Sequence, residues 1–235
     1  MSQLPVIQIE NLRFRYPRAD RDVLDIDSFS VNEGEKVFIK GASGCGKSTL
    51  LSLLGGINIP NAGAVSVHGT SIGELRSSRR DHFRADHIGF IFQMFNLIPY
   101  LSVVENVVLP CRFSKSRNNR ATKKSSLEEE AIRLLAHLEL KGDALLSRKV
   151  TELSIGQQQR VAAARALIGA PDLIIADEPT SSLDADVRES FLKLLFAECQ
   201  QAGSTLVFVS HDASLEKLFD RTVALVEINS AVGAH

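Results

Sequence analysis

The residues with the clearest chemistry lie at positions 41–48, which read GASGCGKS and fit the pattern GxxxxGK[ST]. The preceding VFIK predicts a strand and the following TLLSLL predicts a helix, which is the context that this pattern requires. Glycines let backbone N–H groups surround a phosphate chain, Lys47 reaches its β and γ oxygens, and the Ser48 hydroxyl suits Mg²⁺. The sequence therefore predicts a nucleotide phosphate site formed by Gly41, Ala42, Ser43, Gly44, Cys45, Gly46, Lys47, Ser48 and Thr49.

A second group of polar residues follows the apolar run at 173–176, in the segment LIIADEP. Asp177 and Glu178 stand at the carboxyl end of this predicted strand, where ligands of open α/β sheets bind. An Asp-Glu pair alone is often only a polar strand end. Together with the phosphate loop, it predicts that Asp177 holds Mg²⁺ or its water and that Glu178 deprotonates the attacking water. Kinases, GTPases and motor ATPases all remain open at this point.

The segment LSIGQQQR at residues 153–160 resembles the LSGGQ signature of the ATP-binding cassette (ABC) ATPases. Taken singly, the other matching residues are ordinary packing or turn residues, but all of them follow the order of that family along the whole chain. Tyr16 resembles its adenine-stacking aromatic residue and Gln93 in GFIFQ its Q-loop glutamine. Ser182, Leu183 and Asp184 resemble its D-loop, and His211 in VFVSHD its switch histidine.

This resemblance implies ATP and Mg²⁺ as cofactors and a site completed by a second copy of the chain. Ser154, Gly156, Gln157 and Asp184 are the implied contacts to the nucleotide of the opposite copy. The implied Mg²⁺ ligands are Ser48, Gln93 and Asp177. Glu178, His211, Gln93 and Lys47 form the implied catalytic set.

One residue departs from the signature, because position 155 is Ile where the family usually has Gly. A β-branched residue disfavours positive φ. We therefore expect a shifted signature loop and a reduced rate, without loss of activity.

The elements predicted around these motifs indicate an α/β fold. Apolar runs predict strands at 5–16, 35–40, 173–176 and 205–209, while helical spacing marks residues 102–110, 127–140 and 156–169. The resemblance implies a P-loop NTPase core with a mainly parallel sheet, an N-terminal antiparallel β subdomain and an inserted α-helical subdomain. We assign residues 1–93 and 156–235 to the first two parts and 94–155 to the insertion.

Two segments of the predicted insertion have surface character. Residues 114–126 (SKSRNNRATKKSS) hold five basic residues and no acid, and they predict a solvated loop, with lipid headgroups or an acidic partner as the alternative. Residues 95–101 (FNLIPYL) form a mostly apolar run in a predicted loop. The resemblance implies that a cytosolic helix of a membrane subunit docks there, while packing against the insertion's own helices is the alternative.

Composition limits the remaining choices. The 235 residues carry 27 basic and 28 acidic side chains, so global charge does not favour nucleic acid or an anionic membrane. No apolar run is long enough to span a membrane, and residues 1–14 lack the features of a secretory signal. Three widely spaced cysteines favour a reducing compartment. A cytoplasmic protein is therefore expected.

The stretch FIFQMFNLIPYLSVVENVVLP is similar to that of the lipoprotein-release, macrolide-efflux and cell-division ABC ATPases. This similarity implies a homodimer on the inner face of the membrane that drives an integral permease. The implied substrate is a lipoprotein, a peptide or a drug-like molecule. Two alternatives stay open: the ATPase of a small-solute importer, and a mechanical regulator of a membrane partner. A DNA-repair ATPase is disfavoured because the sequence has neither a coiled coil nor a basic face.

Overall fold

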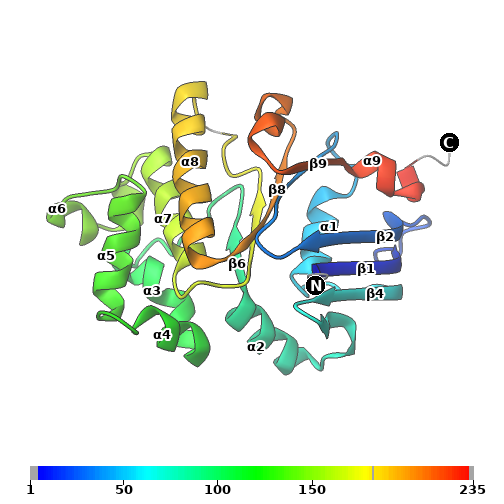
Figure 1. Ribbon diagram of the computed structural model, residues 1–235, viewed down its shortest axis with the longest axis horizontal. Helices are drawn as coiled ribbons and strands as arrows, with labels where there is room; N and C mark the ends of the chain where they lie inside the picture. Colours follow the sequence, from blue (N-terminus) through cyan, green and yellow to red (C-terminus); the bar gives the residue numbers. More distant parts are fainter. Residues whose placement is uncertain (1–4, 182, 233–235) are drawn as a thin grey trace. The chain divides into compact units, whose positions relative to one another are not determined.

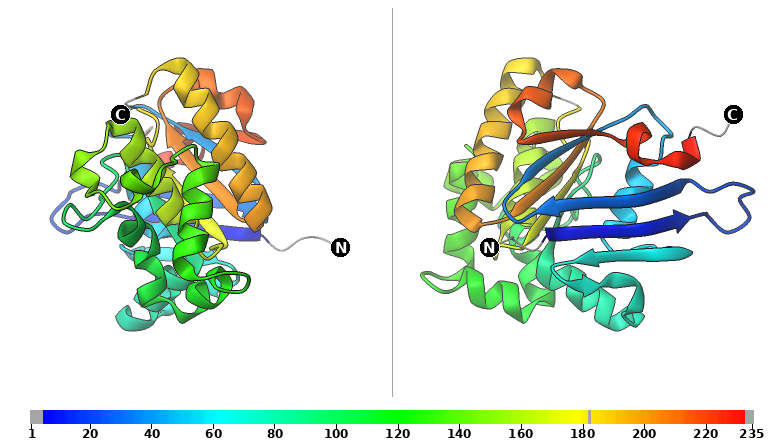
Figure 2. Two further views of the ribbon diagram at one scale, coloured as in Figure 1. Left: turned by 90° about the vertical axis from the view of Figure 1, so that its left-hand side faces the viewer. Right: turned by 45° about the vertical axis from the view of Figure 1, so that its right-hand side comes forward.

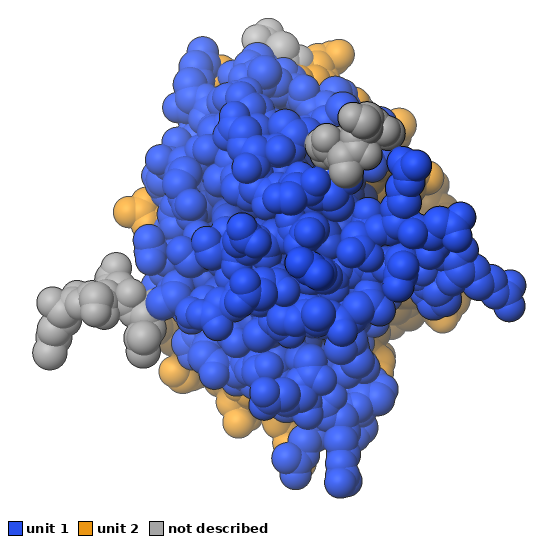
Figure 3. Space-filling model, turned by 90° about the vertical axis from the view of Figure 1, so that its right-hand side faces the viewer, with its two compact units in different colours: residues 1–84, 205–235 blue, residues 85–204 orange. Residues whose placement is uncertain are grey.

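The computed structural model describes residues 5–181 and 183–232, and the chain divides into two units (Figure 3). Unit 1 comprises residues 1–84 and 205–235, and unit 2 comprises residues 85–204. Each unit contains parallel strands and buried apolar side chains of its own.

Unit 1 begins with an antiparallel sheet in the order β2-β1-β4-β5 (Figures 1 and 2). Its strands are β1 (Pro5–Phe14), β2 (Leu24–Asn32), β4 (Ala62–Val67) and β5 (Thr70–Ser71). The pairing of β1 with β4 shifts register between Glu10 and Arg13. Gly63 lies opposite this shift, and a Cβ there would be 2.1 Å from the Asn11 carbonyl oxygen. Glycine at this position therefore permits the close approach of the two strands.

Three parallel strands of unit 1 lie in the order β8-β3-β9. They are β3 (Lys36–Lys40), β8 (Thr205–Ser210) and β9 (Arg221–Ala224). The central residues of β3 and all of β8 are buried, which explains their near-continuous apolar sequence. The ring of Phe38 lies 6.0 Å from that of Phe208 and 5.2 Å from that of Phe219. The strands predicted at 35–40 and 205–209 are confirmed.

Short helices complete unit 1. Helix α1 (Lys47–Leu54) follows β3, as predicted, and helix α2 (Ser77–His87) leads from unit 1 into unit 2. The others are the 3₁₀ helices η1 (Ile72–Glu74), η3 (Ala213–Leu218) and η4 (Ser230–Val232), and helix α9 (Leu225–Ile228).

Unit 2 contains the parallel strands β6 (Ile88–Ile91) and β7 (Leu173–Asp177) and a group of helices (Figure 1). The helices are α3 (Val103–Phe113), α4 (Lys115–Ala121), α5 (Leu127–His137), α6 (Asp143–Leu146), η2 (Val150–Glu152), α7 (Ile155–Leu167) and α8 (Ala185–Ala202). A serine begins α3, α5 and α7, and each serine forms a capping box with the third residue of its helix. The predicted helices at 102–110, 127–140 and 156–169 are confirmed.

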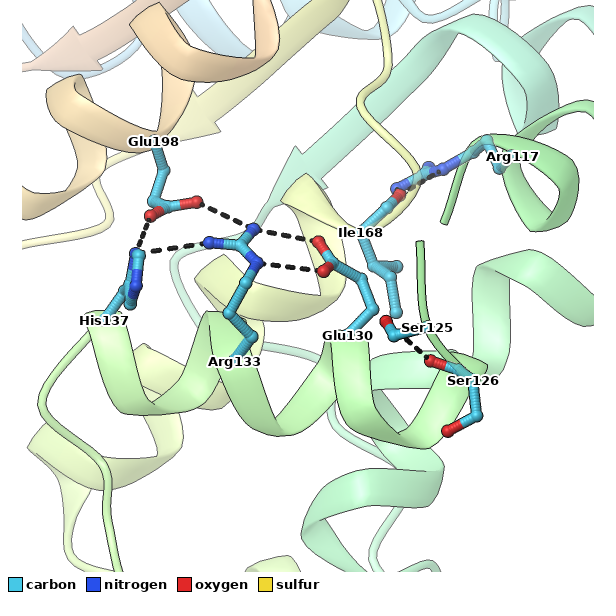
Figure 4. Close-up of polar contacts among 8 residues, drawn as sticks. All are labelled: Arg117, Ser125, Ser126, Glu130, Arg133, His137, Ile168 and Glu198. Carbon is cyan, nitrogen blue, oxygen red and sulfur yellow. Dashed lines mark hydrogen bonds and ion pairs between the residues drawn. The ribbon is translucent and has the colours of Figure 1, made fainter. Parts of the chain in front are cut away.

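An ion-pair network joins α5 to α8 (Figure 4). Glu198 of α8 is only 5% exposed, and its carboxylate accepts from Arg133 at 3.3 Å and pairs with His137 at 2.6 Å. Arg133 also donates two bonds of 2.8 Å to Glu130. These bonds to Glu130 raise the pKa of Arg133, so its guanidinium stays charged and neutralises the buried carboxylate.

The solvated loop predicted at 114–126 is wrong for most of its length, because residues 115–121 form α4. Arg117 is 2% exposed and donates to the carbonyl oxygen of Ala166, near the end of α7, at 2.7 Å. It also donates to the carbonyl oxygen of Ile168 at 2.5 Å (Figure 4). The last carbonyls of a helix have no partner within it and carry negative partial charge, so a buried guanidinium satisfies them. A count of basic residues cannot distinguish this arginine from a solvated one.

The fold is therefore α/β, with parallel strands, a helical group and an N-terminal antiparallel β subdomain, as predicted. The boundaries predicted for the helical subdomain at residues 94 and 155 stay a prediction.

Candidate functional site

The phosphate loop lies between β3 and α1 in unit 1. Gly44 and Gly46 have φ of 81° and 103°, a region that glycine enters without strain. A Cβ on Gly46 would also lie 2.9 Å from Leu24 Cδ2. Gly46 begins α1 without a side-chain cap, and the first turn of α1 contains no acidic residue. The start of this helix is thus suited to an anion.

Lys47 is held over the same loop. Its Nζ donates to the carbonyl oxygens of Gly41 and Ala42 at 2.7 and 3.0 Å. The ammonium group is thereby placed beside the glycine-rich backbone, where the phosphates of a nucleotide are predicted to bind. Ser48 follows it in the first turn of α1.

Tyr16 is fixed at one edge and exposed elsewhere. Its ring packs edge-on against Phe14, with centroids 4.9 Å apart, and 43% of the residue is exposed. The Tyr16 hydroxyl lies 3.1 Å from Oγ1 of the buried Thr49 in α1. A hollow of about 760 Å³ adjoins the ring, lined by residues 14–19, 57–59 and 61 and by Arg80. This volume falls within the usual range of small-molecule pockets, about 300–1,000 Å³.

His211 follows the carboxyl end of β8, at the same edge of the sheet as the phosphate loop. Strands β3 and β8 are parallel, and Lys40 pairs with Ser210. Gly41 and His211 are the next residues of the two strands. The following Asp212 begins η3 by accepting from the Ser214 N–H at 3.0 Å, which fixes the turn after His211. Unit 1 therefore collects the phosphate loop, Tyr16 and His211.

Unit 2 brings Gln93 and the two carboxylates to one sheet edge. Ile91 of β6 pairs with Ala176 of the parallel strand β7, so Gln93 and the pair Asp177 and Glu178 follow the same carboxyl ends. Gln93 is exposed and Glu178 is buried. Glu178 has φ of 46°, a left-handed conformation that costs a non-glycine residue about 1–2 kcal/mol. Its predicted role as base thus coincides with a strained backbone.

The signature segment begins helix α7. Ser154 Oγ accepts from the Gln157 N–H at 3.3 Å, and the Gln157 side chain accepts from the Ser154 N–H at 3.0 Å. Ile155 is 55% exposed, and neither it nor Gly156 has positive φ. Ile155 is therefore not strained, because the first residues of a helix have helical dihedral angles that Ile adopts readily. The shift of the signature loop stays a prediction. The rate effect of Ile155 stays a prediction.

The predicted D-loop precedes α8. Asp184 is the residue before the helix and is exposed, and Ser182 lies outside the described residues. The apolar run at 95–101 divides by burial: Phe95 is 7% exposed, whereas Tyr100 is 75% exposed. Phe95 thus packs inward, and Tyr100 faces solvent.

Two features are absent from the described residues, 5–181 and 183–232. They contain no helix that is long and apolar enough to cross a membrane. Nor do they contain a group of three or more His, Cys, Asp or Glu side chains placed to hold a metal ion.

A family profile described as "ABC transporter" matches residues 24–181. The chain belongs to the ABC transporter family. The family predicted from the LSIGQ segment and its companion motifs is thereby confirmed, and this ABC protein is an ATPase.

Curated relatives of this ABC ATPase resemble it over most of its length. It is 40% identical over 228 residues to an ABC transporter ATP-binding protein of Mycobacterium tuberculosis. This match covers 96% of this chain and 88% of that protein. It is 41% identical over 197 residues to the lipoprotein-releasing system ATP-binding protein LolD of Bacteroides thetaiotaomicron, covering 84% and 87%. The macrolide export ATP-binding/permease protein MacB of Burkholderia pseudomallei is 39% identical over 210 residues, and the match covers 88% of this chain and 31% of MacB.

A solved structure has the same fold. It is the dimeric ATP-binding cassette MJ0796 in a post-hydrolysis state bound to ADP and Pi, with a TM-score of 0.81 and 35% identity over 93% of each chain.

Three features of this ABC ATPase were not predicted from sequence. These are the bond between Tyr16 and Thr49, the left-handed backbone of Glu178, and the bonds from Arg165 in α7 to the loop after Gln93. Each depends on residues or dihedral angles that a motif does not specify. The long separation of Arg165 from Gln93 leaves no local pattern from which it could have been found.

Proposed function

We propose that this ABC ATPase binds MgATP, pairs head to tail with a second copy, and drives an integral membrane permease from the inner face of the membrane. The observation that carries the proposal is the formed phosphate loop, with the Lys47 ammonium on its carbonyls and an uncapped helix start behind it. Similarity to a dimeric cassette bound to ADP and Pi supports the same assignment.

In unit 1, the nucleotide is bound by aromatic stacking and by charge. The exposed ring of Tyr16 stacks on the adenine, while the hydroxyl of Thr49 fixes the ring edge. Backbone N–H groups of residues 41–48 and Nζ of Lys47 contact the phosphates. His211 contacts the γ-phosphate and stabilises the charge that develops on it.

Unit 2 supplies the proton acceptor and the contacts in trans. Glu178 accepts a proton from the water that attacks the γ-phosphate, and Gln93 contacts that phosphate from the neighbouring strand end. Ser154, Gly156, Gln157 and Asp184 contact the nucleotide that is bound by the other copy.

The donor groups proposed for Mg²⁺ are the hydroxyl of Ser48, the amide oxygen of Gln93 and the carboxylate of Asp177. All three offer oxygen, which this hard cation prefers, and Mg²⁺ in nucleotide sites is usually held by few protein groups plus phosphate oxygens. Each of these donors therefore suits the ion by its chemistry. When bound, it neutralises charge on the β and γ phosphates.

The proposed substrate is a lipoprotein, a peptide or a drug-like molecule, handled together with a permease. The name of LolD supports the lipoprotein, and the name of MacB supports the drug-like molecule and the permease. The importer and the mechanical regulator use the same ATPase chemistry. Two observations distinguish the exporter, the importer and the regulator. One is the number of membrane spans in the permease, and the other is a transport assay of the assembled complex.

The direct test of the dimer and of the base is Glu178→Gln. Because the water loses its base while the phosphate loop is unchanged, ATP should still bind, and turnover should fall by about a thousandfold or more. Analytical ultracentrifugation should then show an ATP-dependent dimer. The matched control is Glu189→Gln, an exposed change in the first half of α8 that should alter neither property. Turnover of Glu178→Gln within threefold of wild type would exclude Glu178 as the base.

A further inference from the structure

The loop that follows Gln93 makes an unusual turn in unit 2. Phe95 and Asn96 are consecutive non-glycine residues with φ of 58° and 49°. Their N–H groups bond to the carbonyl oxygens of Phe92 and Met94 at 2.9 and 2.6 Å, so the turn is tight. L-residues rarely adopt this conformation twice in succession, and such a turn persists only where its surroundings hold it.

Arg165 of α7 supplies that hold. Its Nη1 donates to the Asn96 carbonyl oxygen at 2.7 Å and its Nη2 to the Phe95 carbonyl oxygen at 2.5 Å. The planar guanidinium offers two parallel N–H donors from separate nitrogens, which match two adjacent oxygens better than the single nitrogen of a lysine does. Burial lowers the pKa of Arg165 to about 10, which still leaves it charged at neutral pH. Among the described residues the structure gives it no carboxylate partner, so its bonds go to this turn.

Gln93 lies between two fixed points. On one side, Ile91 is paired with Ala176 in the sheet; on the other, Phe95 is buried and bonded to Arg165. Gln93 and Met94 between them are exposed. Helix α7 is itself packed closely on β6, because a Cβ on Gly89 would lie 2.2 Å from the Ala166 carbonyl oxygen. The position of Gln93 is therefore set by β6 and by the end of the helix that begins at the signature.

We propose that Arg165 is a positioning residue for Gln93, fastening the Gln93 loop to the signature helix α7 so that Gln93 and Ser154 move together. The inference rests on the proposed function, in which Gln93 contacts the γ-phosphate. Arg165 itself touches neither nucleotide nor water in this scheme. It acts through the two carbonyl oxygens that it holds.

The test uses a single introduced tryptophan, since the sequence contains none. Met94 is 81% exposed and adjoins Gln93, so Met94→Trp reports on this loop. Arg165→Met and Arg165→Lys are made in that background. The matched control is Arg120→Met, another half-buried arginine of unit 2, which donates to Gly169, Ser116 and Asp86 and does not contact the Gln93 loop.

Two quantities are measured: acrylamide quenching of the introduced tryptophan without nucleotide, and steady-state ATPase activity. Arg165→Met should raise the quenching constant at least twofold and lower kcat at least tenfold, with KM for ATP changed less than twofold. Arg165→Lys, which keeps the positive charge but loses the planar pair of donor nitrogens, should give intermediate values. Arg120→Met should leave both quantities within twofold, although in urea unfolding it should lose a similar amount of stability.

The proposal is overturned if Arg165→Met lowers kcat no more than Arg120→Met does, or if kcat falls while quenching of the introduced tryptophan is unchanged. If Arg165→Met does not fold, the same two criteria apply to Arg165→Lys. A further variant, Gln93→Ala, distinguishes failure of the positioning role of Arg165 from failure of the proposed function of Gln93. If Gln93→Ala lowers kcat but the Arg165 variants loosen the loop without lowering kcat, only the positioning role of Arg165 is wrong. When Gln93→Ala has no effect, the role of Gln93 itself is wrong.

Discussion

At the scale of single residues, the hydroxyl of Tyr16 connects two parts of the proposed nucleotide site in unit 1. Tyr16 lies in the loop after β1, and Thr49 lies in the first turn of the helix that follows the phosphate loop. Their 3.1 Å bond holds the ring edge against α1 while leaving much of the residue exposed. The ring is therefore oriented before a nucleotide binds, which reduces the entropy lost on binding.

Tyr16→Ala should raise KM for ATP with little change in kcat. Stacking on the adenine is the same in ground and transition states, and base stacking on an aromatic residue is worth about 1–3 kcal/mol. Tyr16→Phe should raise KM by less than tenfold, because it removes only a hydrogen bond of about 0.5–1.5 kcal/mol to buried Thr49. Steady-state kinetics measure both. Equal damage by the two substitutions would show that the hydroxyl, and not the ring, carries the effect.

The motifs predicted where the candidate site residues lie in the fold better than they predicted their backbone conformation. The motifs located Lys47, Gln93, Glu178 and His211 at strand ends or helix starts, because those positions follow from the strand and helix patterns. They did not predict the left-handed φ of Glu178, which is set by the turn after β7. Ile155 shows the reverse error: the usual glycine suggested positive φ, but the position is an ordinary first helical residue.

At the scale of elements, three helices of unit 2 begin with a capping box, but the third residue of the helix is not the same in all three. The capping boxes of α3 and α5 use Glu105 and Glu129, whereas that of the signature helix α7 uses Gln157. Bonds from Ser102 and Ser126 lower the pKa of Glu105 and Glu129 respectively. The start of α7 is capped by a side chain that does not titrate.

This difference predicts a pH dependence. A carboxyl group whose pKa is lower in the folded state adds stability above its unfolded pKa, and that stability is lost as pH falls through the folded value. The double variant Glu105→Gln and Glu129→Gln should therefore have a lower Tm than wild type at pH 7. The difference should shrink as pH falls below the ordinary glutamate range. Scanning calorimetry between pH 3 and 7, on the order of one unit per step, tests this.

The control for this experiment is Gln157→Glu, which gives α7 a titratable box and should add a pH dependence of the same sign. If the Tm difference of the double variant is constant over the whole range, the two glutamates do not act through their charge.

Element types were predictable where hydrophobic periodicity was strong, as in α5. The helix α4 was not predictable, because its many basic residues suggest a solvated segment. The partners of Arg117 are backbone carbonyls far along the chain, and these are not visible in the local sequence. Arg117 reaches the end of α7, some fifty positions away. Long-range satisfaction of helix ends has no local sequence signal, so the basic tract was misassigned.

At the scale of the whole molecule, the proposed permease contact depends on the loop before α3. Met94 and Tyr100 are the most exposed large apolar residues there, at 81% and 75%, whereas Phe95 is buried. Exposed apolar side chains in one loop are suited to a protein contact.

Met94→Asp with Tyr100→Asp should leave the ATPase activity and Tm of the isolated subunit within about twofold and 2 °C, since exposed substitutions rarely exceed 0.5 kcal/mol. The same variant should lose co-purification with the permease. Phe113→Asp, at a residue that is 71% exposed at the end of α3, is the matched control and should still assemble. Normal assembly of the double variant would place the docking surface elsewhere.

The proposed pairing of two copies leads to a prediction that can be tested only on a dimer of two different variants. Lys47 is proposed to act on the nucleotide bound by its own chain, and Ser154 on the nucleotide of the partner. Lys47→Ala removes a charge-assisted phosphate contact, and Ser154→Arg places a large cation at the start of α7. Either homodimer should therefore lose almost all activity.

Mixing the two variants puts both defects into one composite site and leaves the other site intact. Activity should return to a substantial fraction of wild type, up to about half of it when the intact site turns over independently. Differently tagged subunits, purified through both tags, establish that the active species is the mixed dimer. A mixture of Lys47→Ala with Glu178→Gln is the matched control, since both act on the nucleotide of their own chain and each site then keeps one defect. Recovery in the first mixture but not in the second assigns Ser154 to the opposite site, whereas no recovery in either would argue that each chain hydrolyses ATP with its own signature.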